Sequence, residues 1–290
     1  QAYDISAYKI AADELVLAGG GQLLFHATAV GLTLREGAAG AVIDAVVIES
    51  KSGRGAIRGQ IFIDGSGDGD LAYWSGAPVE VSETPLYPSL MFRINGVDHE
   101  KAGEAWTTVA RLMDEAEAAG THRFPRKKPI VRPQRNPLEW RSNLTQLSND
   151  DGSPVDGTDV WELTHGEVQG RRQVRDTFEF IRAVTPGFES SYIVDIAPQV
   201  GIRETRRIVG PYQLTEDDIL RCADFSDTVG VNGWPVEAHV AGTVEFRFPD
   251  EGSRGFNHLP FRMLVPQGVD NLYVAGRCAS MTQGGQSSAR

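Results

Sequence analysis

The sequence of 290 residues predicts a mixed fold of the α/β class, with α+β character. The first observation is a bulky apolar run, Ile-Phe-Ile at 61–63, that ends in alternating glycines and the start of a helix. The second is apolar spacing typical of amphipathic helices over residues 4–18, 100–119 and 165–184. The third is a set of β-branched, strand-like segments over residues 23–34, 42–50, 56–63, 91–94, 191–197 and 236–248.

The boundaries of these elements follow from local signals. Glycines 19–21 end the first helix, because glycine readily adopts the left-handed cap conformation. Lys51, Ser52 and Gly53 form the turn between two strands. Thr215 precedes Glu216, Asp217 and Asp218, an order that predicts an N-cap and an acidic first turn of a short helix.

The segment after the apolar run predicts a ligand cradle. Gly65, Gly67 and Gly69 alternate with the polar residues Ser66, Asp68 and Asp70. Glycine permits positive φ and close approach to the backbone, and the start of a helix attracts anions. A strand, a glycine turn and a helix start together suit a ligand with phosphates or hydroxyls. A plain strand-to-helix turn is the alternative that this short motif leaves open.

Composition excludes several classes of function. The net charge is −11 and the pI is about 5.1, which argues against nucleic acid as a partner. No apolar run approaches the roughly 18 residues of a membrane span. Cys222 and Cys278 lie far apart, so they predict no metal site, and a reducing cytoplasm is the expected compartment. Residues 121–137 are basic and rich in proline. A solvated loop is favoured there over an anion-binding or nucleic-acid-binding arm.

Three stretches of the sequence resemble one enzyme family. Residues 62–72 with Gly-Ala-Pro at 76–78, and residues 269–278, are similar to the two FAD-binding segments of FAD-dependent oxidoreductases. These are flavoproteins with two dinucleotide-binding domains, laid out like glutathione reductase and fumarate reductase. Gly65-Ser66 stands where the family usually has Ala-Thr. Residues 201–207 resemble the family's Gly-Ile-Arg-Glu-Thr-Arg-Arg segment.

The resemblance implies a domain organisation. It implies a partial FAD/NAD(P)-binding, Rossmann-like domain in residues 1–80 and 249–290, with an α+β substrate domain inserted as residues 81–248. Residues 1–60 contain no match to the family's Gly-x-Gly-x-x-Gly turn, and the chain ends where the family's last helix is expected. We therefore expect both segments to be lacking and FAD to bind this chain alone weakly or not at all.

The resemblance also implies site residues. The expected FAD-binding residues are Ala29, Val30, Gly65, Ser66, Gly67, Asp68, Asp70, Ala275, Gly276, Arg277 and Cys278, with Gly284, Gly285, Gln286 and Ser287 as a flexible turn near the flavin. The expected catalytic residues are Arg203, Arg262 and His258, with the arginines holding an anionic or carbonyl substrate. Arginines locked to acids such as Glu204, and a histidine satisfied within a loop, are the alternatives.

The function that follows is an FAD-dependent oxidoreductase that transfers a hydride between flavin and a small organic substrate. The alternative is a non-catalytic fragment or binding module that does not hold FAD. The sequence leaves the oligomeric state open, with a homodimer as one option.

Overall fold

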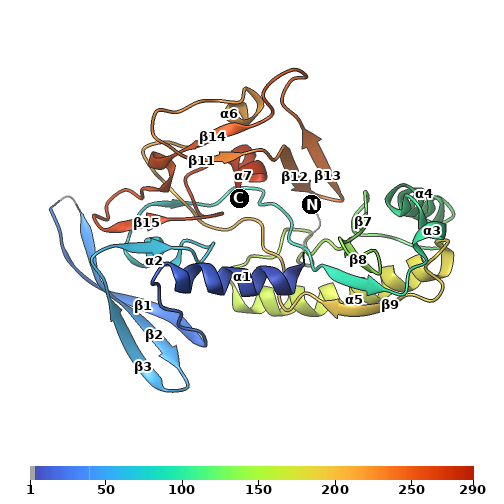
Figure 1. The fold of residues 1–290 in the computed structure, drawn as a ribbon, viewed down its shortest axis with the longest axis horizontal. Coiled ribbons are helices and arrows are strands. Elements are labelled where there is room, and N and C mark those ends of the chain that lie inside the picture. Colours follow the sequence, from blue (N-terminus) through green and yellow to red (C-terminus); the bar gives the residue numbers. More distant parts are fainter. Residues whose placement is uncertain (1–3, 39) are drawn as a thin grey trace. The chain divides into compact units, whose positions relative to one another are not determined.

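The computed structural model describes residues 4–38 and 40–290, which form two compact units. The first unit takes the chain up to Leu24 together with Tyr87–Ile202 and Val240–Val244. The second takes Phe25–Leu86, Arg203–His239 and Glu245–Arg290. Figure 1 shows that both mix helices with strands, which is compatible with the α/β class. Residues 203–239 therefore pack with the glycine turn of residues 65–69, although the resemblance assigns them to the inserted domain.

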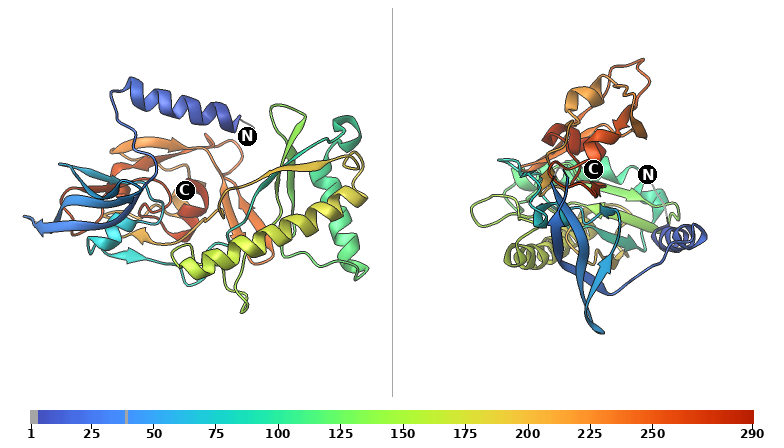
Figure 2. Two further views of the ribbon diagram at one scale, coloured as in Figure 1. Left: turned by 90° about the horizontal axis from the view of Figure 1, so that it is seen from below. Right: turned by 90° about the vertical axis from the view of Figure 1, so that its left-hand side faces the viewer.

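The first unit is an antiparallel sheet with helices on one face. Its strand order is β7 (Ile130–Pro133), β8 (Glu139–Asn143), β6 (Phe92–Asn95) and β9 (Tyr192–Ile196). The helices are α3 (His99–Ala102), α4 (Ala105–Ala118) and α5 (Val160–Val184). Apolar side chains of α4 and α5 pack with those of the sheet, and Trp140 is fully buried in this core. The left panel of Figure 2 shows α4 and α5 on one side of the sheet.

Two predicted helices differ from the observed ones at their N-terminal ends. The helix expected over 100–119 is interrupted at Gly103, whose φ of 48° ends α3 before α4 begins. The helix expected from residue 165 begins already at Val160, because the carboxylate of Asp159 accepts hydrogen bonds from the first backbone N–H groups.

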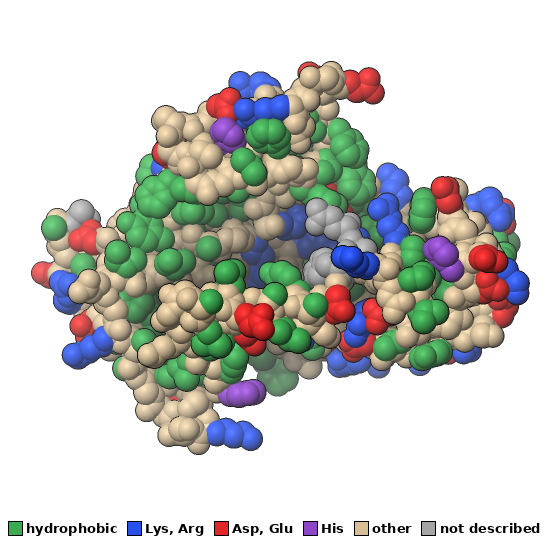
Figure 3. All heavy atoms as spheres, viewed as in Figure 1, with side chains coloured by type: hydrophobic (Ala, Val, Ile, Leu, Met, Phe, Trp, Pro, Cys, Tyr) green, Lys and Arg blue, Asp and Glu red, His purple; other side chains and the backbone are tan. Residues whose placement is uncertain are grey.

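Helix α1 (Ile5–Ala18) forms as predicted but buries none of its side chains within the described residues. The Asp4 carboxylate caps its start, and the glycines after Ala18 end it. Figure 3 shows hydrophobic side chains exposed along this helix. Among the described residues, no helix has the length and apolar character needed to cross a membrane.

The basic segment 121–137 is not a solvated loop throughout. Arg126 is 1% exposed and donates to the Asn143 side chain at 2.7 Å, while residues 130–133 form strand β7. The prediction failed here because composition describes average exposure and not the position of one side chain.

The second unit contains an antiparallel meander and a parallel pair. The meander is β1 (Ala27–Glu36), β2 (Ala41–Ser50) and β3 (Gly53–Arg58). The pair is β4 (Phe62–Asp64) with β15 (Leu272–Val274). The predicted strand 56–63 is therefore two strands. The predicted burial of the apolar run is also wrong in part, because Ile61 and Ile63 are 62% and 66% exposed while Phe62 is buried.

Short elements complete this unit. Its hydrophobic core includes side chains from β2, β4, β15, α2 (Asp70–Trp74) and α6 (Glu216–Leu220). Thr215 caps α6 in a capping box with Asp218, as predicted. The remaining elements are α2 (Asp70–Trp74), β5 (Val79–Glu80) paired with β10 (Arg207–Ile208), α6 (Glu216–Leu220), β11 (Thr228–Asn232) paired with β14 (Asn257–Pro260), β12 (Val236–Val240) paired with β13 (Thr243–Arg247), the 3-10 helix η1 (Phe261–Leu264) and α7 (Gln283–Ala289).

Candidate functional site

The parallel pairing of β4 with β15 brings the two predicted FAD segments together. Asp64 lies opposite Val274 in the register, and the Ala275 N–H donates to the Asp64 carbonyl at 2.9 Å. Both strands therefore end at the same edge, where ligands of open α/β sheets bind. Gly65 and Ser66 follow β4, Ala275 and Gly276 follow β15, and all four are exposed. We call these four residues the strand-end lip.

The buried carboxylate of Asp64 organises the glycine turn. It accepts hydrogen bonds from the Ser66 N–H at 3.0 Å and from the Ser66 hydroxyl at 2.7 Å. Its second oxygen accepts from the N–H groups of Leu71 at 2.8 Å and Ala72 at 3.3 Å, at the start of α2. Asp64 thus acts as a remote cap for α2, since Gly69 at the N-cap position has no side chain. This role of Asp64 was not predicted from the sequence, although a carboxylate between an apolar run and a glycine turn is a usable signal.

Gly67 is required by its backbone conformation and by a close neighbour. Its φ is +80°, and a Cβ there would lie 2.6 Å from Nη1 of Arg277. The Arg277 guanidinium folds over the turn and donates to the Asp68 carboxylate at 2.5 Å. Its Nε is buried, and no described residue accepts from it. Arg277 therefore joins the second predicted segment to the first by an ion pair.

Residues 205 and 206 close over the other side of the turn. The Thr205 hydroxyl donates to the Asp68 carboxylate at 2.6 Å, and Arg206 Nε donates to the Asp68 carbonyl at 2.9 Å. Arg206 also pairs with Asp70 at 2.5 Å and stacks on Tyr73, with its Cζ 4.5 Å from the ring centroid. Burial raises the pKa of Asp70, and the nearby Arg206 opposes that shift. A single strand over residues 203–207 would place Arg203, Thr205 and Arg207 on one face, but only Arg207 and Ile208 are in a strand.

Glu204 and Arg207 form a buried ion pair below the turn. Their side chains are 0% and 5% exposed. Glu204 also accepts from the Leu86 N–H at 2.8 Å and from the Ser82 hydroxyl. Gln286 accepts from Arg207 at 3.0 Å, and its amide nitrogen donates to the Arg277 carbonyl at 2.7 Å. Residues 204–207 therefore form a structural ion-pair network, which was the alternative to a catalytic role for the arginines of this segment.

The predicted flexible turn over Gly284, Gly285, Gln286 and Ser287 is wrong. These residues lie in α7, where Thr282 caps the helix and Gln286 and Ser287 are buried. A Cβ on Gly285 would lie 2.1 Å from the Leu214 carbonyl oxygen, so glycine is needed for close packing. The described chain thus ends in a helix.

Ala29 and Val30 are exposed on β1, a strand that contacts α2. The register of β1 with β2 shifts between Ala29 and Gly31, so Val30 sits in a bulge. Their contact with a cofactor stays a prediction.

Two of the three expected catalytic side chains hold carboxylates. His258 Nδ1 lies 2.8 Å from Asp224, and the Arg262 guanidinium pairs with Asp227. Arg262 also stacks on Tyr212, with its Cζ 4.7 Å from the ring centroid. Burial raises the pKa of Asp227, but the hydrogen bond from the Arg262 N–H and its positive charge outweigh burial, so the pKa is lowered. Arg203 is half-buried, and its catalytic role stays a prediction.

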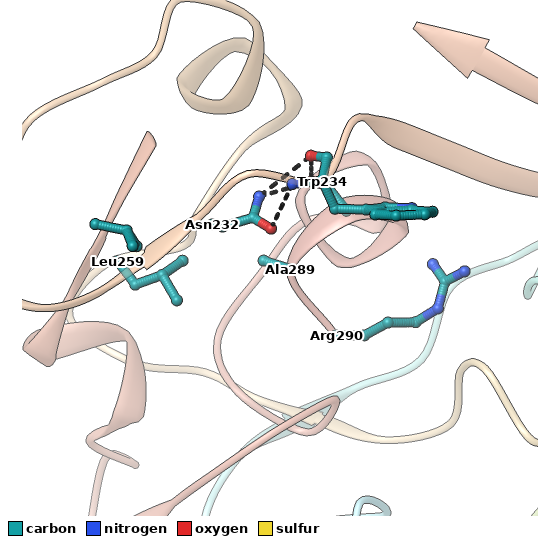
Figure 4. Close-up of a pocket in the computed structure, with 7 residues that line it drawn as sticks. Asn232, Trp234, Leu259, Ala289 and Arg290 are labelled. Carbon is teal, nitrogen blue, oxygen red and sulfur yellow. Dashed lines mark hydrogen bonds between the residues drawn. The ribbon is translucent and has the colours of Figure 1, made fainter. Parts of the chain in front are cut away.

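A separate hollow of about 400 Å³ lies beside α7 and β11 (Figure 4). Asn232, Trp234 and Leu259 line it, and the Asn232 amide donates to the Ser288 hydroxyl at 2.8 Å. Successive strand residues point to opposite faces, so His258 points away from the hollow that Leu259 lines.

Glycine turns at the carboxyl ends of adjacent parallel strands are typical of proteins that bind nucleotide cofactors. Comparison with known families specifies the class. The family described as FAD dependent oxidoreductase matches residues 1–290, and the chain belongs to that family. Its cofactor is therefore FAD.

Other comparisons add little. No curated protein matches the chain. Among solved structures, the chain is similar to BexE, from a study of oxidation during BE-7585A biosynthesis, with 13% identity and a TM-score of 0.34. The similarity covers 64% of this chain and 30% of BexE.

The strand-end lip is open next to its two glycines. A Cβ built on Gly65 or Gly276 meets no atom within 4 Å, so the space above both residues is open. Gly276 has a φ of +84°, which presents the backbone without a side chain. These residues fit a cofactor that approaches the backbone closely.

Proposed function

We propose that the protein is an oxidoreductase that transfers a hydride between FAD and a small organic substrate. The observation that carries the proposal is the parallel pairing of β4 with β15, which places two glycine segments from distant parts of the sequence at one edge. A Rossmann-like arrangement around this pair, a small molecule as the partner and a cytoplasmic location belong to the same proposal.

The strand-end lip would hold the cofactor through its backbone. Gly65 and Ser66 would face the adenosine side, while Ala275 and Gly276 would face the flavin or its ribityl-phosphate part. Asp68, Asp70, Arg277 and Cys278 would shape the lip from beneath, because Asp68 pairs with Arg277, Asp70 pairs with Arg206 and Cys278 is buried. Bound FAD supplies the hydride acceptor or donor at flavin N5, and the protein supplies its position.

The substrate side of the proposal keeps Arg203, Arg262 and His258. An arginine aimed at an oxygen that gains charge stabilises the transition state. The ion pairs of Arg262 with Asp227 and of His258 with Asp224 must loosen or orient these groups for such a role.

A titration of the full-length protein with FAD tests the cofactor site. Gly276→Ala should weaken FAD binding by about tenfold or more, because its Cβ enters the lip where the cofactor would approach the backbone. Gly268→Ala is the matched control, because Gly268 has a similar φ of +77° and equally open surroundings outside the lip. Equal dissociation constants for both variants would refute the assignment.

The same preparation separates the proposal from its alternative. If the protein is colourless after incubation with saturating FAD and removal of the unbound FAD, it is the non-catalytic binding module. If the protein is yellow but no organic substrate reduces or reoxidises its flavin, FAD binding is supported and the proposed hydride transfer is refuted.

A further inference from the structure

The sheet of the first unit places three arginines opposite one another on neighbouring strands. In the register, Arg132 of β7 faces Arg141 of β8, and Arg141 faces Arg93 of β6. Residues opposite each other in antiparallel strands share a face, where like charges are destabilising. Ile94 and Trp140, which alternate with the arginines, are buried in the core. By register the arginines therefore lie on the face opposite this core, although Arg132, on the edge strand β7, also reaches Trp106 of α4.

The three guanidinium groups differ in their partners. Arg93 pairs with Glu139 at 3.4 Å and with Asp195 at 3.2 Å. Arg132 lies over the Trp106 ring, with its Cζ 5.6 Å from the centroid. Within residues 4–38 and 40–290, no hydrogen bond or ion pair reaches the side chain of the half-buried Arg141. A repelled, partly desolvated cation without a counter-ion is costly for folding alone.

A cavity of about 300 Å³ adjoins this cation. Arg93, Arg141 and Gln134 line it from the sheet, and Lys9 lines it from α1. The amide nitrogen of Gln134 is buried and has no hydrogen-bond partner among the described residues. The rest of the lining contains Ser6, Asp195, which pairs with Arg93, and the apolar residues Ile5, Met91, Phe92, Ala197 and Pro198. The cavity thus combines donors that lack an acceptor with an apolar wall.

We propose that this cavity binds a small organic carboxylate. The carboxylate would accept hydrogen bonds from the planar guanidinium of Arg141 and from the side-chain N–H of Gln134. The apolar part of the ligand would contact the apolar lining of the cavity. The volume lies at the lower end of the range for small-molecule pockets. The binding of this carboxylate is independent of the proposed function. The further step, that the bound carboxylate is the substrate of the oxidoreductase, rests on the proposed function.

Calorimetric titration of the full chain without FAD tests the binding. Benzoate and hexanoate are the probes, and benzamide and hexanamide are their uncharged counterparts. We expect dissociation constants of about 1 mM or tighter for the acids and at least about tenfold weaker binding of the amides, because a charge-assisted bond is lost. Inorganic phosphate should bind more weakly than benzoate, since it cannot use the apolar wall.

Three variants locate the site. Arg141→Met should weaken benzoate binding about tenfold or more and leave the Tm unchanged or raised, because it removes a repelled charge. Arg132→Met removes the same charge from the same row outside the cavity, and should change benzoate affinity less than about threefold. Gln134→Met should also weaken binding while retaining the fold, because it removes a buried donor that has no partner.

The results divide clearly. If neither benzoate nor hexanoate binds when its concentration is raised to about 10 mM, the proposal is overturned. Equal binding of acids and amides, phosphate binding as tight as benzoate binding, or equal effects of Arg141→Met and Arg132→Met would also overturn it. Carboxylate binding without flavin reduction would instead leave the site and remove only its role as a substrate site.

Discussion

The buried pair of Glu204 and Arg207 gives a stability prediction whose size follows from the structure. Replacing Arg207 with methionine keeps most of the side-chain volume but leaves the fully buried Glu204 carboxylate without a cation. Breaking a buried pair by removing one partner costs about 3–5 kcal/mol, because the remaining charge is uncompensated. The Ser82 hydroxyl and the Leu86 N–H still donate to Glu204, so we expect the lower half of that range.

The double variant Glu204→Gln with Arg207→Met separates charge from packing. It removes the uncompensated carboxylate, so its loss of unfolding free energy should be smaller than the sum of the two single losses by about 2 kcal/mol or more. Urea unfolding followed by circular dichroism measures each loss, and calorimetry gives the matching change in Tm. Arg111→Met is the control, because it breaks an exposed pair with Glu115 and should cost less than about 1 kcal/mol.

Additive losses would refute this reasoning. They would mean that Glu204 and Arg207 act through independent contacts, with no electrostatic coupling. A loss in Arg207→Met as small as that of Arg111→Met would likewise show that water reaches the pair.

Three further predictions concern the second unit. Asp64→Asn should lower the unfolding free energy by about 2–4 kcal/mol in urea titrations, because an amide N–H then faces backbone donors that a carboxylate satisfied. Gly67→Ala should lower the Tm, since its Cβ meets Arg277, whereas Gly65→Ala, with open space, should not. For Glu237, burial raises the pKa, but hydrogen bonds from His239 and Trp234 outweigh it and lower the pKa to about 2 from 4.5. A lowered carboxyl pKa stabilises the folded state above the unfolded pKa. That stability is lost as the pH falls from about 4.5 towards 2, so the Tm of Glu237→Gln should fall less over this window than that of the wild type.

The sequence predicted the glycine turn because its information is local. An apolar run followed by Gly65, Gly67 and Gly69 requires a strand end and a turn, whatever the surrounding fold. The pairing of this strand with residues 272–274 did not follow from spacing. The resemblance assigned both segments to FAD binding, and their pairing was seen only in the structure.

Burial and packing could not be predicted because they depend on distant residues. The run at 61–63 has the same local pattern whether one face or both faces of the strand are covered, and in this unit Ile63 is exposed. Residues 283–289 contain two glycines and two serines, which disfavour a helix by propensity. The Thr282 cap and the close approach of Gly285 to Leu214 outweigh that propensity.

The charges around the glycine turn explain why an acidic segment is compatible with a cofactor that carries phosphates. Asp64 is neutralised by backbone N–H groups, Asp68 by Arg277, and Asp70 by Arg206. The arginines that pair with the turn, Arg206 and Arg277, are different from Arg203 and Arg262, which are expected to bind a substrate. Each of these carboxylates is paired with N–H groups or with an arginine of the same unit. The surroundings of the strand-end lip therefore carry little net negative charge, and an anionic ligand can approach the exposed glycine backbone.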